Sequence, residues 1–236
     1  MLKNKMDAYF YPALTDNWDD TLFRNVVLDY LSKDMTMLDL GAGSGHLPMM
    51  NFKGLCQKVV GVDPDGIVLT NANLDESHVC YGENLPFDDD FFDICISDNV
   101  WEHIEKPIEL LLEVRRVLKP GGIYLAKTPN KFHYVSLLAQ ITPHWFHEAV
   151  NSLRGRSSED TFETLYRLNS SRTIKGCARA AGLKTEFFKS YEGRPEYLRI
   201  SALTYLAGII YERLVNFFGF LERFRVIHIV MLRKNG

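Results

Sequence analysis

The chain has 236 residues, of which 46% are hydrophobic and 24% charged, with a formal net charge of −3. This composition is typical of one soluble globular domain, and a mildly acidic chain has no basic footprint for duplex nucleic acid, so we expect no nucleic-acid partner. The four cysteines form no C-x-x-C pair and indicate free thiols rather than a disulfide or zinc framework. The first residues lack the long apolar segment of a signal peptide, which predicts a cytoplasmic location.

Residues 18–31 carry apolar side chains at spacings of three and four. This pattern predicts an amphipathic helix, with Asp16 or Asn17 as its N-cap.

The next stretch, residues 37–46, reads Met-Leu-Asp-Leu-Gly-Ala-Gly-Ser-Gly-His. It predicts a buried strand that turns through three glycines into a helix over residues 45–52. Glycine permits positive φ and lets a ligand approach the backbone, and the unpaired N–H groups of the helix start would point into the same turn. The spacing is G-x-G-x-G, which differs from the G-x-G-x-x-G of a dinucleotide fingerprint. The turn therefore predicts a cofactor cradle.

A second strand, residues 58–62, ends at Asp63, eighteen residues after Gly45. An acid at the tip of the second strand is placed to accept both hydroxyls of a ribose. A helix over 65–74 and a short strand over 77–81 follow. The apolar run 91–98 predicts a central strand, whose carboxyl end faces the cofactor. These features predict an adenosine-type cofactor, and a nicotinamide dinucleotide remains open at this point.

Five motifs occur in a fixed order along the chain. They are Leu38-Asp39-Leu40-Gly41-Ala42-Gly43-Ser44-Gly45, Val62-Asp63, Glu83-Asn84-Leu85-Pro86-Phe87, Phe91-Phe92-Asp93-Ile94 and Val117-Leu118-Lys119-Pro120-Gly121-Gly122. Together they resemble the class I S-adenosylmethionine-dependent methyltransferases, in particular the small-molecule group that contains the ubiquinone and menaquinone biosynthesis enzymes. The resemblance is strong over residues 35–130 and weak in the flanks.

The resemblance implies an α/β fold with a Rossmann-like seven-stranded sheet. The sheet is expected to be mostly parallel, with an antiparallel last strand and helices on both faces. Residues 1–236 would form a single domain, in which 128–160 and 194–222 are acceptor-side insertions or a lid. The strands predicted at 183–191 and 225–232 would form the antiparallel edge, after a helix that Ser170 or Ser171 caps.

The resemblance further implies that S-adenosyl-L-methionine is the cofactor and S-adenosyl-L-homocysteine the product. The implied cofactor-binding residues are Asp39, Gly41, Ala42, Gly43 and Gly45 for the methionine part, Asp63 and Pro64 near the ribose, Gly82, Glu83 and Asn84 for the adenine, and Asn99 and Val100 at the end of the 91–98 strand. The family often has an acid at the position of Tyr81, so adenine recognition here would rest on Glu83 or on the backbone of Gly82 and Glu83.

His103 is the candidate catalytic base, since it follows the strand end that faces the cofactor. Family members often carry a histidine here without a proven role in proton transfer, and packing alone would also explain its neighbours. No pair of histidines has metal-ligand spacing, so no metal is expected. The connection over 128–158, rich in aromatic, His and Arg residues, is where we expect the acceptor pocket.

Residues 197–220 are apolar on nearly all sides, and 200–211 contain no charge. This run is shorter than the ~20 residues needed to span a bilayer. It is flanked by arginines, and residues 194–236 hold seven basic and three acidic residues, a net +4. Three interpretations stay open: a helical lid over the acceptor, a homodimer face, or an interfacial helix in peripheral contact with a membrane.

The predicted function is methyl transfer to a small-molecule acceptor by direct displacement, in which the protein mainly positions the acceptor atom. The apolar 197–220 element favours a hydrophobic or lipid-linked acceptor, whereas Arg154 and Arg156 leave a sugar or carboxylate acceptor open.

Two other classes of protein compete with the prediction of a methyltransferase. A short NAD-dependent reductase is disfavoured by the glycine spacing and by the absence of a Tyr-x-x-x-Lys pair, and a catalytically silent cofactor-binding protein is conceivable because of Tyr81.

Overall fold

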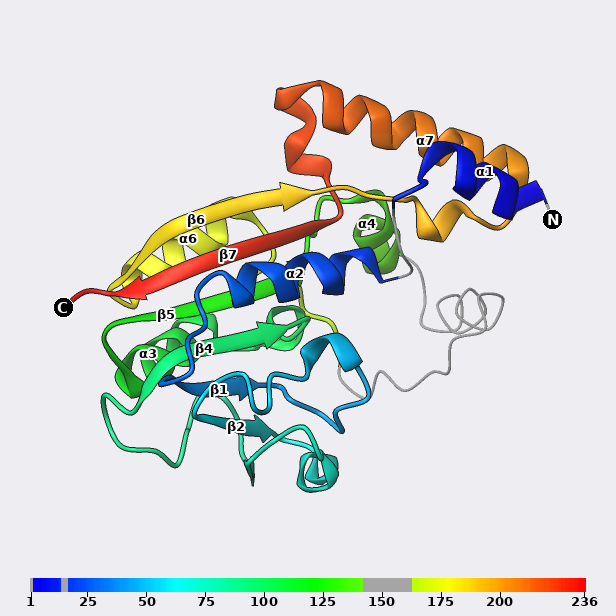
Figure 1. Cartoon of the computed structure of the whole chain (residues 1–236). Coiled ribbons are helices and arrows are strands. Elements are labelled where there is room, and N and C mark those ends of the chain that lie inside the picture. Colours follow the sequence, from blue (N-terminus) through cyan, green and yellow to red (C-terminus); the bar gives the residue numbers. More distant parts are fainter. Residues whose placement is uncertain (1, 14–16, 142–162) are drawn as a thin grey trace.

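In the computed structural model, which describes residues 2–13, 17–141 and 163–236, one seven-stranded sheet runs through the described part of the chain (Figure 1). Its order is β3-β2-β1-β4-β5-β7-β6. The strands are β1 (Thr36–Leu40), β2 (Lys58–Asp63), β3 (Glu76–Val79), β4 (Phe92–Asp98), β5 (Leu118–Pro129), β6 (Leu183–Tyr191) and β7 (Ile227–Lys234). The first five pair in parallel, and β7 is antiparallel to both β5 and β6. The predicted sheet with its antiparallel last strand is confirmed.

Helices cover both faces of this sheet. They are α1 (Leu2–Phe10), α2 (Trp18–Leu28), α3 (Pro107–Val117), α4 (Tyr134–Ile141), α6 (Ser171–Ala180) and α7 (Ala202–Phe217), with short 3₁₀ helices η1 (Pro48–Met50), η2 (Gly66–Thr70), η3 (Trp101–His103), η4 (Glu196–Leu198) and η5 (Gly219–Phe224). Because side chains alternate along a strand, each face has its own core. Leu38 and Tyr124 pack with α3 and α6 on one face, whereas Met37 and Ile94 pack with α2 on the other.

The two helices predicted over 45–52 and 65–74 are wrong. Only the 3₁₀ helices η1 and η2 form there. Gly45 has a φ of +79°, which is incompatible with a helix start at that residue. In the second segment the Asn71 side chain accepts a hydrogen bond from Asn73 N (2.9 Å), a local turn that competes with helical bonding.

Helix caps agree in part with the prediction. Ser170 caps α6 and forms a capping box with Thr173, as expected. Asn17 occupies the N-cap position of α2, but it has a left-handed backbone and makes no side-chain capping bond. The other predicted cap, Asp16, lies outside the described residues.

Helix α7 lies beside α1, beyond the β6 and β7 edge of the sheet (Figure 1). Tyr11, which follows α1, donates a hydrogen bond through its hydroxyl to Glu212 Oε2 (3.1 Å). No described helix is long and apolar enough to cross a membrane. The predicted insertion over 128–160 begins with α4, and its residues from 142 onward lie outside the described part of the chain.

Candidate active site

Two neighbouring cavities lie at the carboxyl ends of β1, β2 and β4. The larger, of about 540 Å³, lies between the end of β2 and η3, and the smaller, of about 150 Å³, lies against the glycine turn after β1. β1 and β4 are adjacent although β2 and β3 intervene in the sequence. This is a topological switch point, where open α/β sheets bind their ligands.

The glycine turn is shaped by backbone conformation and by lack of space. Gly41, Gly43 and Gly45 have φ values of +78°, +49° and +79°. A Cβ at Gly41 would lie 2.3 Å from Val100 Cγ2, and one at Gly45 would lie 2.1 Å from Asn71 Oδ1. Nothing lies within 4 Å of a Cβ built at Gly43, so the centre of the turn is open. The sequence therefore needs glycine at all three positions, and the turn leaves room for a ligand at its middle.

Two asparagines support the turn, and the sequence analysis did not identify them. Asn71 Nδ2 donates to the carbonyl oxygens of Ala42 (3.0 Å) and Gly43 (3.2 Å), and Asn73 Nδ2 donates to that of Gly45 (2.8 Å). Because they lie 28 or 29 residues away from the carbonyl groups that they bind, the sequence did not reveal this role.

Asp63, at the end of β2, faces the turn. Its Oδ2 accepts a hydrogen bond from Gly43 N (3.0 Å) and its Oδ1 accepts one from Asp65 N (2.9 Å). The carboxylate is held in a fixed orientation at the wall of the larger cavity, next to Pro64. Each oxygen can accept further hydrogen bonds, because an ionised carboxylate has about four lone-pair sites.

Asp39 and Asp98 form an acidic floor beneath the smaller cavity. Burial, and then the Asp98 and Asp63 carboxylates, raise the pKa of Asp39 to about 7. Burial also raises the pKa of Asp98 to about 6, although Lys127 opposes the shift. Asp98 lines both cavities and therefore joins them. A cation bound here would relieve the repulsion between the two carboxylates.

Lys127, on β5, is fully buried and is the counter-ion of this floor. Its Nζ lies 2.9 Å from Asp98 Oδ1 and 3.1 Å from Asp19 Oδ2, and it also bonds Asp20. Burial lowers the pKa of Lys127, but the three carboxylates outweigh it and hold that pKa well above its ordinary value. Sequence reasoning missed Lys127, and the signal was a lone lysine directly after the apolar run 123–126.

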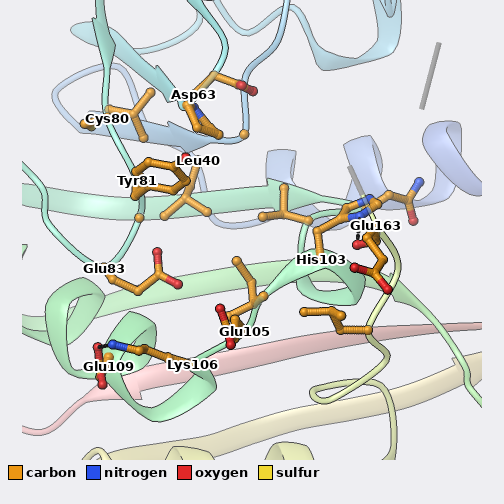
Figure 2. A pocket seen from close by; sticks show the side chains of 18 of the residues that line it. Leu40, Asp63, Cys80, Tyr81, Glu83, His103, Glu105, Lys106, Glu109 and Glu163 are labelled. Atoms are coloured by element: carbon orange, nitrogen blue, oxygen red, sulfur yellow. Dashed lines mark hydrogen bonds and ion pairs between the residues drawn. The ribbon is translucent and has the colours of Figure 1, made fainter. Parts of the chain in front are cut away.

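The predicted adenine segment lies at one end of the larger cavity, with Asp63, Cys80 and Tyr81 close together (Figure 2). Gly82 and Glu83 line this cavity too, and a Cβ on Gly82 would lie 2.6 Å from Leu110 Cδ1. Asn84 is not among the lining residues. The predicted Asn99 and Val100 line the same cavity.

His103 lies at the opposite end of the larger cavity, beside Glu163 (Figure 2). Its Nδ1 is 3.0 Å from the carbonyl oxygen of Glu163. Since a carbonyl oxygen only accepts, Nδ1 donates, and the neutral ring therefore carries no proton on Nε2. In this tautomer Nε2 can accept a proton, as a general base must.

Glu102, the residue before His103, is buried beneath the cavity rather than in its wall. Burial, more than any other cause, raises its pKa to about 8. Thr128 Oγ1 donates to its carboxyl (3.4 Å), and its backbone oxygen accepts from Leu165 N (2.6 Å) and Tyr166 N (3.1 Å). Glu102 therefore ties residues 165–166 to η3. Its burial was not apparent from the sequence.

Several predicted acceptor residues cannot be placed at the site. Arg154, Arg156, His144 and His147 lie outside the described residues. His133 is buried, 3.5 Å from Glu192 Oε2, and lines neither cavity. Among the described residues there is no group of three His, Cys, Asp or Glu that could hold a metal ion.

Residues 38–126 match the model of a methyltransferase domain. Relatives described as uncharacterized methyltransferases occur in Mycolicibacterium vanbaalenii (36% identity over 95 residues, 38% of this chain and 37% of that protein) and Mycobacterium tuberculosis (36% over 102 residues, 37% of each). The chain thus spans little more than a third of the length of these relatives.

Solved structures share the fold. YcgJ from Bacillus subtilis has 20% identity and a TM-score of 0.56 over 91% of this chain and 99% of that one. Geranyl diphosphate C-methyltransferase from Streptomyces coelicolor, solved with S-adenosyl-L-homocysteine, has 16% identity and a TM-score of 0.58 over 92% and 78%. The [4+2]-cyclase SpnF, with 16% identity, has a TM-score of 0.58 over 91% and 80%. The recognition of a class I methyltransferase domain is confirmed, and the ubiquinone and menaquinone group stays a prediction.

Replacing Lys127 with Met would leave Asp98 buried without its counter-ion. We expect the free energy of unfolding at neutral pH to fall by about 3–5 kcal/mol, as when one partner of a buried ion pair is removed. Adding Asp98→Asn to Lys127→Met should recover part of this loss. Denaturant titration of the single and double variants measures both effects. The control is Lys119→Met, whose pair with Asp93 (2.7 Å) is only partly buried and should contribute about 1 kcal/mol. Equal losses in Lys127→Met and Lys119→Met would contradict the role of the buried lysine.

Glu102 should make stability depend on pH. Its pKa rises from 4.5 to about 8 on folding, so the folded state binds more protons than the unfolded state between these values, and stability falls as pH rises. Glu102→Gln removes this dependence. We expect the free energy of unfolding of the variant to rise relative to that of the parent by up to about 1.4 kcal/mol for each pH unit between pH 5 and 8. Urea unfolding at each pH measures this difference. The exposed Glu109→Gln is the control, and parallel stability curves for Glu102→Gln and the parent would refute the prediction.

Proposed function

We propose that the chain is a methyltransferase that binds S-adenosyl-L-methionine and releases S-adenosyl-L-homocysteine. The observation that carries the proposal is the open glycine turn, backed on one side by Asp63 and on the other by the acidic floor of Asp39 and Asp98. The methyltransferase-domain match over residues 38–126 supports it. The cofactor carries a sulfonium and an ammonium, and buried carboxylates suit a ligand with two positive centres.

The residues that line the two cavities suggest how each part of the cofactor would be held. Asp39 and Asp98 would accept hydrogen bonds from the ammonium of the methionine part, over the turn. The remaining lone pairs of Asp63 would accept the ribose hydroxyls. Tyr81, Gly82 and Glu83 would flank the adenine at the far end of the larger cavity. Lys127 keeps Asp98 in place and charged, although it lines neither cavity.

The cofactor supplies a methyl group bonded to a positive sulfur, which is already a good leaving group. The chain then has to hold an acceptor atom in line with that methyl carbon and to exclude water. The acceptor atom forms its new bond to carbon as the carbon–sulfur bond breaks, and the sulfur keeps the electron pair. His103 Nε2 takes the proton that the acceptor loses, because the Nδ1–H bond to Glu163 keeps the ring in the required tautomer.

We propose a hydrophobic or lipid-linked acceptor. The larger cavity has apolar walls from Leu40, Val62, Val100, Ile104 and Leu165. Its charged residues include four acids, Glu83, Glu105, Glu109 and Glu163, against one lysine, Lys106, that pairs with Glu109 (3.1 Å). This negative potential would repel a carboxylate and favours a neutral apolar molecule. Such acceptors are found in membranes, so we also propose a cytoplasmic protein in peripheral contact with a membrane through residues 197–220.

Asp63→Ala tests cofactor binding directly. We expect calorimetric titration with S-adenosyl-L-methionine and S-adenosyl-L-homocysteine to give an affinity at least about tenfold lower in the variant, because each hydrogen bond to a charged group contributes about 1.5–3 kcal/mol. Asp65→Ala is the matched control: its side chain accepts only from Ile67 N (2.9 Å) and lines neither cavity. If folded parent protein binds neither ligand, the proposal fails. Binding without turnover on any acceptor would identify a silent cofactor-binding protein.

His103→Gln separates binding from catalysis. We expect the affinity for S-adenosyl-L-homocysteine to stay within about threefold of the parent. Transfer of labelled methyl groups to apolar acceptors should fall by about 10²–10⁴, the usual contribution of a general base. The loss should be smaller at high pH, where the acceptor ionises without help. Unchanged transfer at every pH would mean that His103 only packs against Glu163.

A further inference from the structure

Helix α7 is apolar on its outward side as well as on its inward side. Its outward stripe follows helical spacing: Leu203, Leu206, Ile210, Leu214 and Phe217, with exposed fractions of 79%, 44%, 53%, 46% and 81%. Its buried stripe, which faces the protein, is Tyr205, Gly208, Ile209, Glu212 and Val215. A surface helix normally turns its charged side to water and its apolar side inward. The outward side of this helix is apolar too, which indicates that it meets something other than water.

The inward polar groups fix the helix in this orientation. The Tyr205 hydroxyl donates to Asp7 of α1. Glu212 accepts from the Tyr11 hydroxyl (3.1 Å) and from Asn216 Nδ2 (2.6 Å). Rotating α7 to bury its apolar stripe would break the bonds that Tyr205 makes to Asp7 and that Tyr11 makes to Glu212, and Glu212 would keep only partners within α7. These hydrogen bonds therefore fix the helix with its apolar stripe facing outward.

The end of α7 extends this face into η5. Phe217, Phe218 and Phe220 have exposed fractions of 81%, 40% and 74%. Contiguous exposed apolar patches on soluble proteins mark interaction sites. Aromatic side chains on the apolar side of a helix are typical of helices that lie in the membrane interface.

The exposed charges around this face are mostly basic. The only carboxylate of α7, Glu212, is buried. Arg213 has a side chain that is 56% exposed, and Arg223 of η5 is exposed as well. The exposed Glu222 is the one acid beside the phenylalanines in the described part of η5, and Arg225 lies 3.9 Å from its carboxylate. Arginines next to an apolar stripe complement the negative surface of an anionic bilayer.

We propose that α7 and η5 dock the protein on an anionic lipid bilayer, with the apolar stripe in the interface and Arg213 and Arg223 at the headgroups. α7 has 16 residues and is about 24 Å long, and exposed arginines border its apolar stripe. This basic border favours an anionic bilayer over a second copy of the chain, because a second copy would bring arginines of like charge to the same interface. Docking itself is independent of methyl transfer; only the supply of an apolar acceptor from the bilayer rests on the proposed function.

The test is co-sedimentation of the full chain with phosphatidylcholine vesicles, with and without phosphatidylserine. We expect the parent to bind the anionic vesicles, and the double variant Leu203→Gln/Phe217→Gln to bind them at least about tenfold more weakly. Both side chains are about four-fifths exposed, so the variant should fold normally. Arg223→Glu should weaken binding to anionic vesicles more than to neutral ones. Leu69→Gln, an equally polar change at an exposed leucine of η2, should leave binding unchanged.

Three results would overturn the proposal: no binding of the parent to either vesicle, equal binding of the double variant, or a parent dimer in sedimentation velocity that the double variant converts to monomer. The last would make this face an interface between copies. Calorimetry with S-adenosyl-L-methionine on the same samples separates the two proposals. Vesicle binding without cofactor binding would refute the proposed function alone, and the reverse would refute the docking alone.

Discussion

The ion pairs of the buried Lys127 ammonium are the interactions on which the site depends. This ammonium lies at the end of the buried part of β5 and meets carboxylates from two directions, Asp98 of β4 and the pair Asp19 and Asp20 of α2. Burial is the main reason that the pKa of Asp98 stays raised despite its partner, and the carboxylates of Asp20 and Asp19 add to the shift. The same contacts hold α2 over the sheet. The floor of the cavities and the helix above that face of the sheet are therefore positioned by one side chain.

The glycine turn depends in a similar way on groups that are distant in sequence. Gly41 N and Ala42 N donate to Val62 O (2.8 and 3.1 Å), and Asn71 and Asn73 bind the carbonyl oxygens of the turn. Backbone groups that a crossover helix would have paired internally are thus satisfied by side chains from the η2 region. These hydrogen bonds support the turn without filling the space beside Gly43. A ligand needs that space to approach the backbone.

Apolar runs predicted the individual strands and glycine spacing predicted the turn after β1, because both report local geometry. The seven-stranded sheet with its antiparallel last strand and the set of cofactor-binding residues were implied by the resemblance to methyltransferases. The strand over 183–191 matches β6 residue for residue. The helix over 45–52 was wrong because Asn71 and Asn73, distant in sequence, bind the carbonyl oxygens of the glycine turn that precedes it. The helix over 65–74 was wrong because the Asn71 side chain forms a local turn with Asn73 N. Lys127 was missed because its partners Asp19 and Asp20 lie more than a hundred residues away. Long-range polar contacts of this kind leave no periodic signal.

The three interpretations of residues 197–220 could not be separated by sequence because an apolar stripe is the same whichever way it faces. Its direction is set by Asp7 and Tyr11, from the other end of the chain. Those contacts also join α7 to the site: α1 ends at Phe10, α2 begins at Trp18, and Gly193 packs so closely against Trp18 that a Cβ would lie 2.4 Å from its ring. Gly193, which precedes α7 in the chain, thus contacts α2, and α2 contacts Lys127 through Asp19 and Asp20. The outward face of α7 is thereby held in a fixed relation to the floor of the cavities, which is the geometry that delivery of an apolar acceptor from a surface would need.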